Sequence, residues 1–262
     1  MSNYTVNDNV SRADRVRPKL INIDGFFNIF KPVGITSNAC LAKFRRQANV
    51  KKSGYSGTLD PFAEGVLPIA CGKATKLIEE VVSMDKEYVF VAQFGSETDT
   101  GDSEGVVVAK NDKMPTLEEI NAKINEKFIG SIMQSPHVYS AIKINGTRLC
   151  DIARKQNIDP AELQAIADSR AKEIRIDKFE ILPFMAEEQG LFNDMALKFV
   201  VKCGKGTYIR KLVVDLARDL GAYAHTIKLS RTAAGPFNIK DSIDLLTLNS
   251  DNLFDFCVTS LK

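Results

Sequence analysis

Residues 88–94, YVFVAQF, constrain the fold of this chain more than any other segment. β-Branched and aromatic side chains fill most of the segment, which predicts a strand whose two faces are both covered. Predicted strands and helices mix along the chain without strict βαβ alternation, so we expect an α+β fold with a largely antiparallel sheet. The other predicted strands cover residues 26–30, 66–71, 106–109, 139–144, 174–182 and 195–203, and the predicted helices cover residues 38–47, 74–82, 116–128 and 208–220.

Capping residues mark the ends of several predicted helices. Ser37 precedes the first helix and Thr207 the last, and both have side chains suited to an N-cap. Gly221 follows the last helix, where a left-handed residue commonly ends a helix. Thr116 and Glu119 have the spacing of a capping box.

The composition is that of an ordinary globular protein, with 44% apolar and 26% charged residues in a chain of 262. A chain of this length can bury a good core as one large domain. It has no apolar run near the roughly 18 residues that a membrane span needs, so we expect a cytoplasmic protein without a membrane association. The N-terminal residues lack an apolar segment and include Asp8 and Asp14, which argues against a targeting peptide.

The pattern of metal-binding residue types predicts no metal site. The five cysteines are far apart and contain no C-x-x-C pair, and the chain has only two histidines, so nothing has zinc-ligand spacing. The loop over residues 95–105 carries four acids, but their spacing is not that of an EF-hand. We therefore expect reduced thiols and no metal.

Basic residues cluster although the net charge is only +2. Residues 43–52 and residues 198–211 each carry five lysines or arginines and no acid. Such runs suit a phosphate backbone, although the charge pattern alone favours solvated surfaces that are merely segregated. The phosphate contacts expected from the first run are Arg45, Arg46, Lys51 and Lys52.

A short turn in residues 56–68, SGTLDPFAEGVLP, carries the strongest functional signal. It places Asp60 between a basic pair and an apolar segment, in a glycine-bounded turn that can hold a carboxylate out at a site. The alternative is structural, because Asp60 followed by Pro61 is also the pattern of a helix N-cap with proline at the first helical position.

Further sequence words stand in a fixed order around this turn. They are KPVGITS (31–37), GTLDP (57–61), GKATK (72–76), TDTGD (98–102), YSAIK (139–143), GTYIR (206–210) and the pair Leu229 and Arg231. Taken together, they resemble the bacterial tRNA pseudouridine-55 synthase family, which isomerises the T-loop uridine of tRNA, over about residues 26–237. The resemblance implies an isomerase that acts on the T arm as a monomer, with no cofactor and no obligate protein partner.

The resemblance also implies a role for each matching residue. Asp60 corresponds to the catalytic carboxylate, and Arg210 to the arginine that pairs with it; a facing cation favours the ionised carboxylate. Tyr88 corresponds to the tyrosine that stacks on the target base, and Leu229 would line the base pocket. The residues expected to support the site are Lys31, Pro32 and Arg231.

Tyr55 departs from the family, which has histidine at this position. A phenol ring can stack as an imidazole does, but it cannot carry a proton near neutral pH. If the position serves for stacking in the gap left by a flipped base, Tyr55 can replace the histidine; otherwise the activity and target preference have changed.

The extent of the resemblance predicts the domain organisation. An insertion at about residues 144–173 begins at the hairpin signal Asn145-Gly146, and we expect it to be mobile and to close over RNA. About 25 residues follow Phe237, too few for the PUA-type RNA-binding domain of many family members. The expected parts are a flexible N-terminal extension (1–25), a catalytic domain (26–248) and a C-terminal tail (249–262).

Three alternative functions remain at this stage. A guide-RNA-dependent pseudouridine synthase shares the core, but it relies on protein partners and a PUA-type domain. An RNA chaperone that remodels the tRNA elbow would not need catalysis, whereas Asp60, Tyr88 and Arg210 are all intact. A metal-free glycosidase would need a second carboxylate, and no identifiable motif supplies one.

Overall fold

The computed structural model describes residues 20–139, 142–144, 146–154 and 159–261. Residues 1–19 of the predicted N-terminal extension lie outside this range. The rest of that extension packs on the protein, because the Ile21 N–H donates to the Asn49 carbonyl at 2.9 Å and Ile23 is buried. Within the described residues, no helix is long and apolar enough to cross a membrane.

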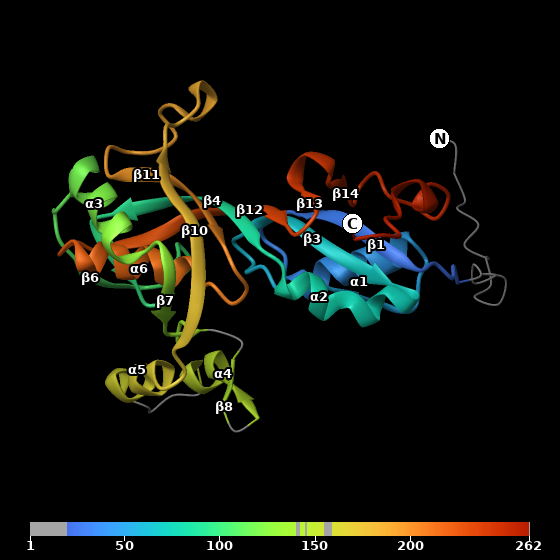
Figure 1. Cartoon of the computed structure of the whole chain (residues 1–262), viewed down its shortest axis with the longest axis horizontal. Helices are drawn as coiled ribbons and strands as arrows, with labels where there is room; N and C mark the ends of the chain where they lie inside the picture. Colours follow the sequence, from blue (N-terminus) through green and yellow to red (C-terminus); the bar gives the residue numbers. More distant parts are fainter. Residues whose placement is uncertain (1–19, 140–141, 145, 155–158, 262) are drawn as a thin grey trace, which may run out of the picture.

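A ten-stranded sheet runs through the described chain in the order β14-β1-β3-β12-β4-β11-β10-β7, with β13 paired to β12 and β2 paired to β3 (Figure 1). Among these described strands, only β14–β1 and β12–β3 pair in parallel, so the predicted α+β fold with a largely antiparallel sheet is confirmed. The strands are β1 (Gly25–Lys31), β2 (Ser53–Tyr55), β3 (Glu64–Cys71), β4 (Lys86–Phe94), β7 (Gly130–Gln134), β10 (Lys172–Leu182), β11 (Ala196–Cys203), β12 (Ala224–Ala234), β13 (Phe237–Asn238) and β14 (Ile243–Asp244).

The sheet has two halves (Figure 1), and each half has its own core. In the carboxylate half, which we define as β1, β2, β3, β14 and helix α1 (Ser37–Gln47), Phe27 packs on Phe44 with ring centroids 5.1 Å apart. In the arginine half, defined as β4, β7, β10, β11, β12 and helices α3 (Leu117–Lys127) and α6 (Ile209–Asp219), Phe90 stacks on Phe199 at 5.4 Å. Asp60 lies on the turn that leads into β3, and Arg210 lies on α6. Leu59, Phe62 and Ala63 beside Asp60 pack in the core of the arginine half, so this turn bridges the two halves.

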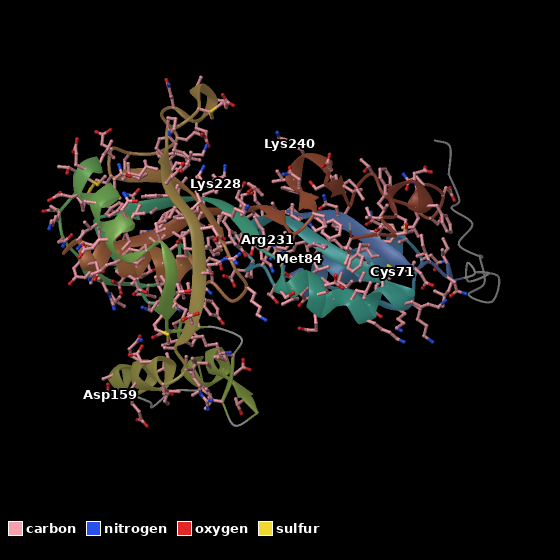
Figure 2. The ribbon with its side chains drawn as sticks, viewed as in Figure 1. Cys71, Met84, Asp159, Lys228, Arg231 and Lys240 are labelled. Atoms are coloured by element: carbon pink, nitrogen blue, oxygen red, sulfur yellow. The ribbon has the colours of Figure 1, made fainter. Side chains whose placement is uncertain are left out.

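The halves meet through β12, a strand that the sequence did not predict. Its parallel contact with β3 is short, with Ser230 opposite Glu64 and Arg231 opposite Gly65. Arg231 and Thr226 are buried in this strand, and such polar residues at inward positions obscure the alternation that would predict a strand. Figure 2 shows Arg231 between the two halves.

Several predicted helix ends differ from the structure. Thr36 rather than Ser37 caps α1, since its hydroxyl accepts from the Ala39 N–H at 3.0 Å. Thr207 does not cap α6, because its hydroxyl donates to the Gly204 carbonyl at 3.1 Å. The capping box of α3 is confirmed, and Gly221 follows α6 with φ +67° as expected. Residues predicted as one helix over 74–82 form a 3₁₀ turn (Gly72–Leu77) followed by α2 (Ile78–Ser83).

Shorter elements complete the described chain. Strands β5 (Ser96–Thr98) and β6 (Val107–Lys110) flank the acidic loop. The insertion has its own small core around Leu149, Leu163 and Ala167; Asn145 of its predicted turn lies outside the described residues. The predicted C-terminal tail packs on β1, because the Val258 N–H donates to the Phe26 carbonyl at 2.8 Å. The insertion contains β8 (Lys143–Ile144), β9 (Thr147–Arg148), α4 (Leu149–Arg154) and α5 (Pro160–Asp168), and further 3₁₀ turns are Ala186–Glu188, Ile239–Asp241 and Leu253–Phe256.

Candidate active site

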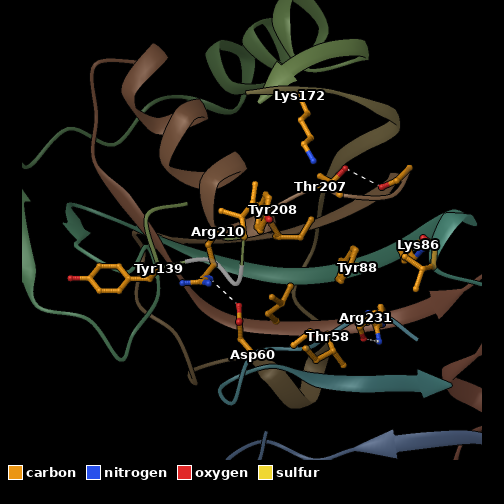
Figure 3. Close-up of a pocket in the computed structure, with 18 residues that line it drawn as sticks. Thr58, Asp60, Lys86, Tyr88, Tyr139, Lys172, Thr207, Tyr208, Arg210 and Arg231 are labelled. Carbon is orange, nitrogen blue, oxygen red and sulfur yellow. Dashed lines mark hydrogen bonds and ion pairs between the residues drawn. The ribbon is translucent and has the colours of Figure 1, made fainter. Parts of the chain in front are cut away.

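A cavity of about 450 Å³ lies where the two halves meet (Figure 3). The turn before β3 forms one wall, and β4, β12 and the loop before α6 form the others. The residues that line it are Gly57, Thr58, Leu59, Asp60, Val82, Lys86, Tyr88, Tyr139, Ile142, Lys172, Gly204, Gly206, Thr207, Tyr208, Ile209, Arg210, Leu229 and Arg231. The cavity therefore brings together four of the predicted site residues with Asp60.

Asp60 is held in a turn, and the helix N-cap alternative is wrong. Residues 57–63 form no helix, and the Ala63 N–H donates to the Asp60 carbonyl at 3.1 Å. The Asp60 side chain is 38% exposed, and its Oδ2 lies 2.9 Å from Arg210 Nε. Among the described residues no hydrogen bond engages Oδ1. Asp60 thus has one oxygen held by a cation and one oxygen available in the cavity.

Arg210 is fixed by the acidic loop as well as by Asp60. Its Nη1 lies 3.0 Å from Asp102 Oδ2 and donates to the Thr100 carbonyl at 2.7 Å. Asp102 is itself buried, and its Oδ1 accepts from the Thr100 hydroxyl at 2.7 Å and from the Glu104 N–H at 3.0 Å. Because several acceptors hold the guanidinium, its Nε is directed at Asp60 without depending on a bound substrate.

The sequence words identified the acidic loop, but they did not predict that Asp102 holds the Arg210 guanidinium. The backbone at Gly101 has φ +68°, a conformation that favours glycine. At Gly105, a Cβ would lie 2.2 Å from the Thr100 hydroxyl oxygen, which leaves no room for a side chain. Asp99 accepts from the Tyr139 hydroxyl at 3.1 Å and joins this loop to the cavity wall. The signal that could have found Asp102 is the glycine before it, which indicates a constrained turn.

Lys31 supports the Asp60 turn from behind and does not reach the cavity. Its side chain is fully buried, and Nζ donates to the carbonyls of Ile35 at 2.7 Å and Pro32 at 2.9 Å. Burial lowers the pKa of Lys31. The same loop holds the turn directly, because the Gly34 N–H donates to the Pro61 carbonyl at 2.8 Å. The supporting role of Lys31 and Pro32 stays a prediction; the structure places both residues in the loop that contacts the Asp60 turn.

Ser37 also holds the turn, instead of capping α1. Its buried hydroxyl lies 3.0 Å from the Leu59 carbonyl oxygen and 2.8 Å from the Leu59 nitrogen. Leu59 precedes Asp60, so this contact fixes the backbone one residue before the carboxylate.

Arg231 joins β12 to the same turn. It is 1% exposed, its Nε donates to the Val66 carbonyl at 2.7 Å, and its Nη2 donates to the Gly57 carbonyl at 3.0 Å. A Cβ on Gly65 would lie 2.3 Å from the Arg231 carbonyl oxygen, so only glycine permits this close pairing of β3 with β12.

Tyr88 and Leu229 form an apolar part of the cavity wall. Tyr88 lies on β4 opposite Arg231 of β12, and Leu229 lies opposite Phe90. Burial raises the pKa of Tyr88, while the charge of Arg231 opposes that rise in part. The phenol is therefore neutral at physiological pH and presents an apolar ring to whatever enters the cavity.

Lys86 is a cavity residue that the sequence did not indicate. It is buried and donates to the carbonyls of Val81, Val82 and Met84, at the end of α2. Burial lowers its pKa to about 8, and repulsion from Arg231 adds to that effect. Nothing in its sequence context distinguished it from an ordinary strand residue.

Tyr55 does not line the cavity. It lies on β2 opposite Ile69, and its half-buried ring packs on the core of the carboxylate half. Tyr55 is therefore close to Asp60 in the sequence, but its ring packs on the core of the carboxylate half and not in the cavity.

The predicted phosphate contacts also lie outside the cavity. All four are exposed, and Arg45 also donates from Nε to the Ser53 hydroxyl at 2.8 Å. In the second basic run, internal ion pairs occupy three of the five cations. Lys198 pairs with Glu188, Arg210 with Asp60 and Asp102, and Lys211 with Asp215, which leaves Lys202 and Lys205 exposed.

Comparison with known proteins gives the class of this protein. Residues 45–209 match the family model described as TruB family pseudouridylate synthase (N terminal domain). The match covers more than half of the chain and includes Asp60, so the protein is a pseudouridine synthase, an isomerase.

Individual relatives give the family. tRNA pseudouridine synthase B of Francisella philomiragia is 42% identical over 236 residues, which cover 90% of this chain and 71% of that protein. The enzyme of the same name from Francisella tularensis subsp. novicida is 38% identical over 226 residues, covering 86% and 70%. This chain belongs to the TruB family of pseudouridylate synthases, and the resemblance found in the sequence words is confirmed.

Solved structures share the same fold. A Cbf5-Nop10-Gar1 complex contains a chain that is 28% identical, with a TM-score of 0.61 over 85% of this chain and 52% of that one. An H/ACA ribonucleoprotein bound to a substrate RNA containing 2′-deoxyuridine gives 26% identity and a TM-score of 0.58, over 85% and 51%. The present chain spans about half of the length of these structural relatives.

Proposed function

We propose that this protein converts uridine to pseudouridine at position 55, in the T arm of tRNA. Its relatives named tRNA pseudouridine synthase B are up to 42% identical, whereas the chain in the Cbf5-Nop10-Gar1 complex is 28% identical. The higher identity favours tRNA as the substrate over an RNA presented by a ribonucleoprotein.

The observation that carries the proposal is the ion pair between Asp60 and Arg210 at the cavity wall, with Asp60 Oδ1 left available. Isomerisation breaks the N1–C1′ bond, turns the uracil and forms a C5–C1′ bond; C5 then loses its proton and N1 gains one. A carboxylate can assist by attacking C1′ or by removing the 2′ hydrogen. Either step uses ionised Asp60 and a free oxygen, and Arg210 stabilises that charge from the opposite side.

The detached uracil must be retained while it turns. Tyr88 offers a ring face and Leu229 an apolar contact in the same cavity, so we assign them the stacking and lining roles. The net reaction is neither an oxidation nor a reduction, and its proton transfers involve only side chains and water. We therefore propose that it requires no cofactor and no metal.

The target uridine has to leave the folded tRNA before it can enter the cavity. Tyr139 and Ile142 line the cavity at the start of the insertion, which has its own core. We assign the insertion at about 144–173 the role of a unit that closes over the RNA. The exposed Arg46, Lys51 and Lys52 would contact phosphates farther from the site.

We propose that a monomer acts on tRNA without a protein partner, in the cytoplasm; the contact between Asp60 and Arg210 forms within a single chain. Light scattering of the protein with and without tRNA tests this part: a 1:1 complex is expected, and a dimer as the active species would contradict it.

The decisive experiment incubates the protein with an unmodified tRNA transcript and maps pseudouridine by chemical probing. We expect modification at position 55 and none in a matched transcript with cytidine there. Asp60→Asn should bind the tRNA and unfold at the same temperature as the parent protein. Its activity should fall by about 10²- to 10⁴-fold or more. Modification at another uridine would refute the position, and substantial turnover by Asp60→Asn would refute the role of Asp60.

A further inference from the structure

Lys172 lines the cavity opposite the Asp60 turn and belongs to neither basic run of the sequence. It is the first residue of β10 and lies at the end of the insertion of about residues 144–173. Its side chain is exposed, and Figure 3 shows the amine pointing into the cavity toward the loop that carries Thr207. It is therefore a cation at the cavity mouth, where RNA has to enter.

The other cations that line the cavity are already engaged with the protein. Lys86 donates to carbonyls at the end of α2. Arg210 holds Asp60 and Asp102, and Arg231 holds the carbonyls of Val66 and Gly57. Lys172 differs from all three, because its amine makes neither a hydrogen bond nor an ion pair with any group in the described part of the protein. Its charge is available to a ligand.

The backbone of Lys172 is rigidly placed relative to the site. Lys172 pairs with Gln134 in the β10–β7 ladder. The buried Gln134 amide clamps Tyr208, accepting from its N–H at 2.8 Å and donating to its carbonyl at 3.1 Å. Tyr208 comes immediately before α6, which carries Arg210. Strand β10, the Gln134 amide and α6 therefore fix the backbone of Lys172 with respect to Arg210. A lysine on a free loop would not be fixed in this way.

We infer that Lys172 binds a backbone phosphate of the RNA beside the flipped uridine and so helps to position that nucleotide. When a base leaves its stack and enters a cavity, its flanking phosphates stay at the mouth, and removing them from water requires a compensating charge. An exposed ammonium on a fixed backbone meets this need. The inference rests on the proposed function, since it assumes that RNA enters this cavity.

Binding measurements test the inference separately from catalysis. Lys172→Ala and Lys172→Arg are compared with Lys240→Ala, which alters an exposed lysine that does not line the cavity (labelled in Figure 2). Binding to unmodified tRNA transcript should weaken about 10-fold in Lys172→Ala, and its log–log salt slope should become shallower by about 0.7–0.9. Lys172→Arg and Lys240→Ala should bind as the parent does. An unchanged affinity and slope in Lys172→Ala would overturn the inference.

Methylphosphonate substitution locates the phosphate. Single neutral linkages are placed one at a time through a synthetic T-arm stem–loop, and each RNA is bound by the parent and by Lys172→Ala. At one linkage beside the target uridine, the neutral substitution should lower the RNA affinity of the parent about 10-fold. It should not lower the affinity of Lys172→Ala any further. Additive losses at every linkage would refute the contact.

These measurements also distinguish the two proposals. Repeating them in an Asp60→Asn background prevents any conversion of the RNA during binding. If the parent forms no pseudouridine but the effects of Lys172→Ala and of one neutral linkage are non-additive, the proposed function fails and the Lys172 contact stands. If the parent is active and the two effects are additive at every linkage, only the Lys172 contact fails.

Discussion

The carboxylate half and the arginine half of the sheet hold their parts of the site by different means. In the carboxylate half, Lys31 donates to the Pro61 carbonyl and Ser37 to the Leu59 carbonyl of the Asp60 turn, and Arg231 reaches across from β12 to the Gly57 carbonyl. These contacts fix where the carboxylate stands. Because they are hydrogen bonds to backbone groups from buried side chains, they couple the position of the turn to the stability of the fold.

In the arginine half, charged side chains hold one another. Arg210 lies between Asp60 and Asp102, and His137 is buried beside them. This arrangement determines the electrostatic environment of the carboxylate more than its position. The difference predicts that changes behind the turn lower stability first, whereas changes around Arg210 lower activity or alter the response to pH.

The largest stability effect is expected from Arg231→Met. The variant keeps an apolar chain of similar length but leaves the carbonyls of Val66 and Gly57 without a donor. Each unsatisfied buried carbonyl costs about 1–3 kcal/mol, so we expect a loss of about 2–6 kcal/mol in the free energy of unfolding, measured with urea.

Arg175→Met serves as the matched control, because Arg175 is 54% exposed and pairs with Asp85 at the surface. Such pairs contribute about 0–1 kcal/mol. If the two variants lose equal stability, Arg231 does not hold the halves together.

The next effect concerns pH and the buried His137. Burial lowers its pKa to about 3, and the charges of Arg210, Lys211 and Arg218 add to this. The unfolded chain binds a proton at this residue near pH 6.5 and the folded chain does not, so stability should fall as pH drops from about 6.5 toward 3, by up to about 1.4 kcal/mol per pH unit. His137→Gln should remove that contribution to the slope. Parallel unfolding curves of the parent and the variant at pH 7, 6, 5 and 4 test this, and identical slopes would contradict it.

Asp102→Asn tests the charge network of the arginine half. The amide keeps the shape of the side chain but removes the charge that faces Arg210. Hydrogen bonds to charged groups are worth about 1.5–3 kcal/mol, so we expect kcat to fall about 10- to 100-fold with tRNA affinity nearly unchanged. Glu104→Gln, an exposed acid in the same loop, should stay within about two-fold of the parent. Equal losses in the two variants would argue against a specific role for Asp102.

The smallest effect is expected at Tyr55, and it distinguishes packing from stacking on RNA. Because the half-buried ring packs on the carboxylate-half core, Tyr55→Ala should lower the free energy of unfolding by about 1–2 kcal/mol. Tyr55→Phe should keep both stability and turnover. If Tyr55→Ala instead keeps full stability and loses about 5- to 150-fold in activity, the ring acts on RNA in the gap left by the flipped base.

Local patterns predicted those elements whose signals lie within a few residues. The capping box of α3 and the amphipathic run of α6 are confirmed, because capping and helical periodicity act over one or two turns. Strand β12 was missed because Arg231 and Thr226 occupy buried positions where apolar residues are expected. Ser37 was wrongly predicted to cap α1, since its hydroxyl binds Leu59, which is 22 residues away.

The sequence by itself determined that Asp60 stands in a glycine-bounded turn within an ordered set of family words, and this was enough to predict the enzyme class. The resemblance already paired Arg210 with Asp60, and the structure places the two 2.9 Å apart. Only the tertiary structure decided the groups around this pair: Asp102 holds Arg210, and Lys172 lies across the cavity. Turns and caps depend on neighbouring backbone groups, whereas charges that are far apart in the chain meet only after β12 has joined the two halves of the sheet.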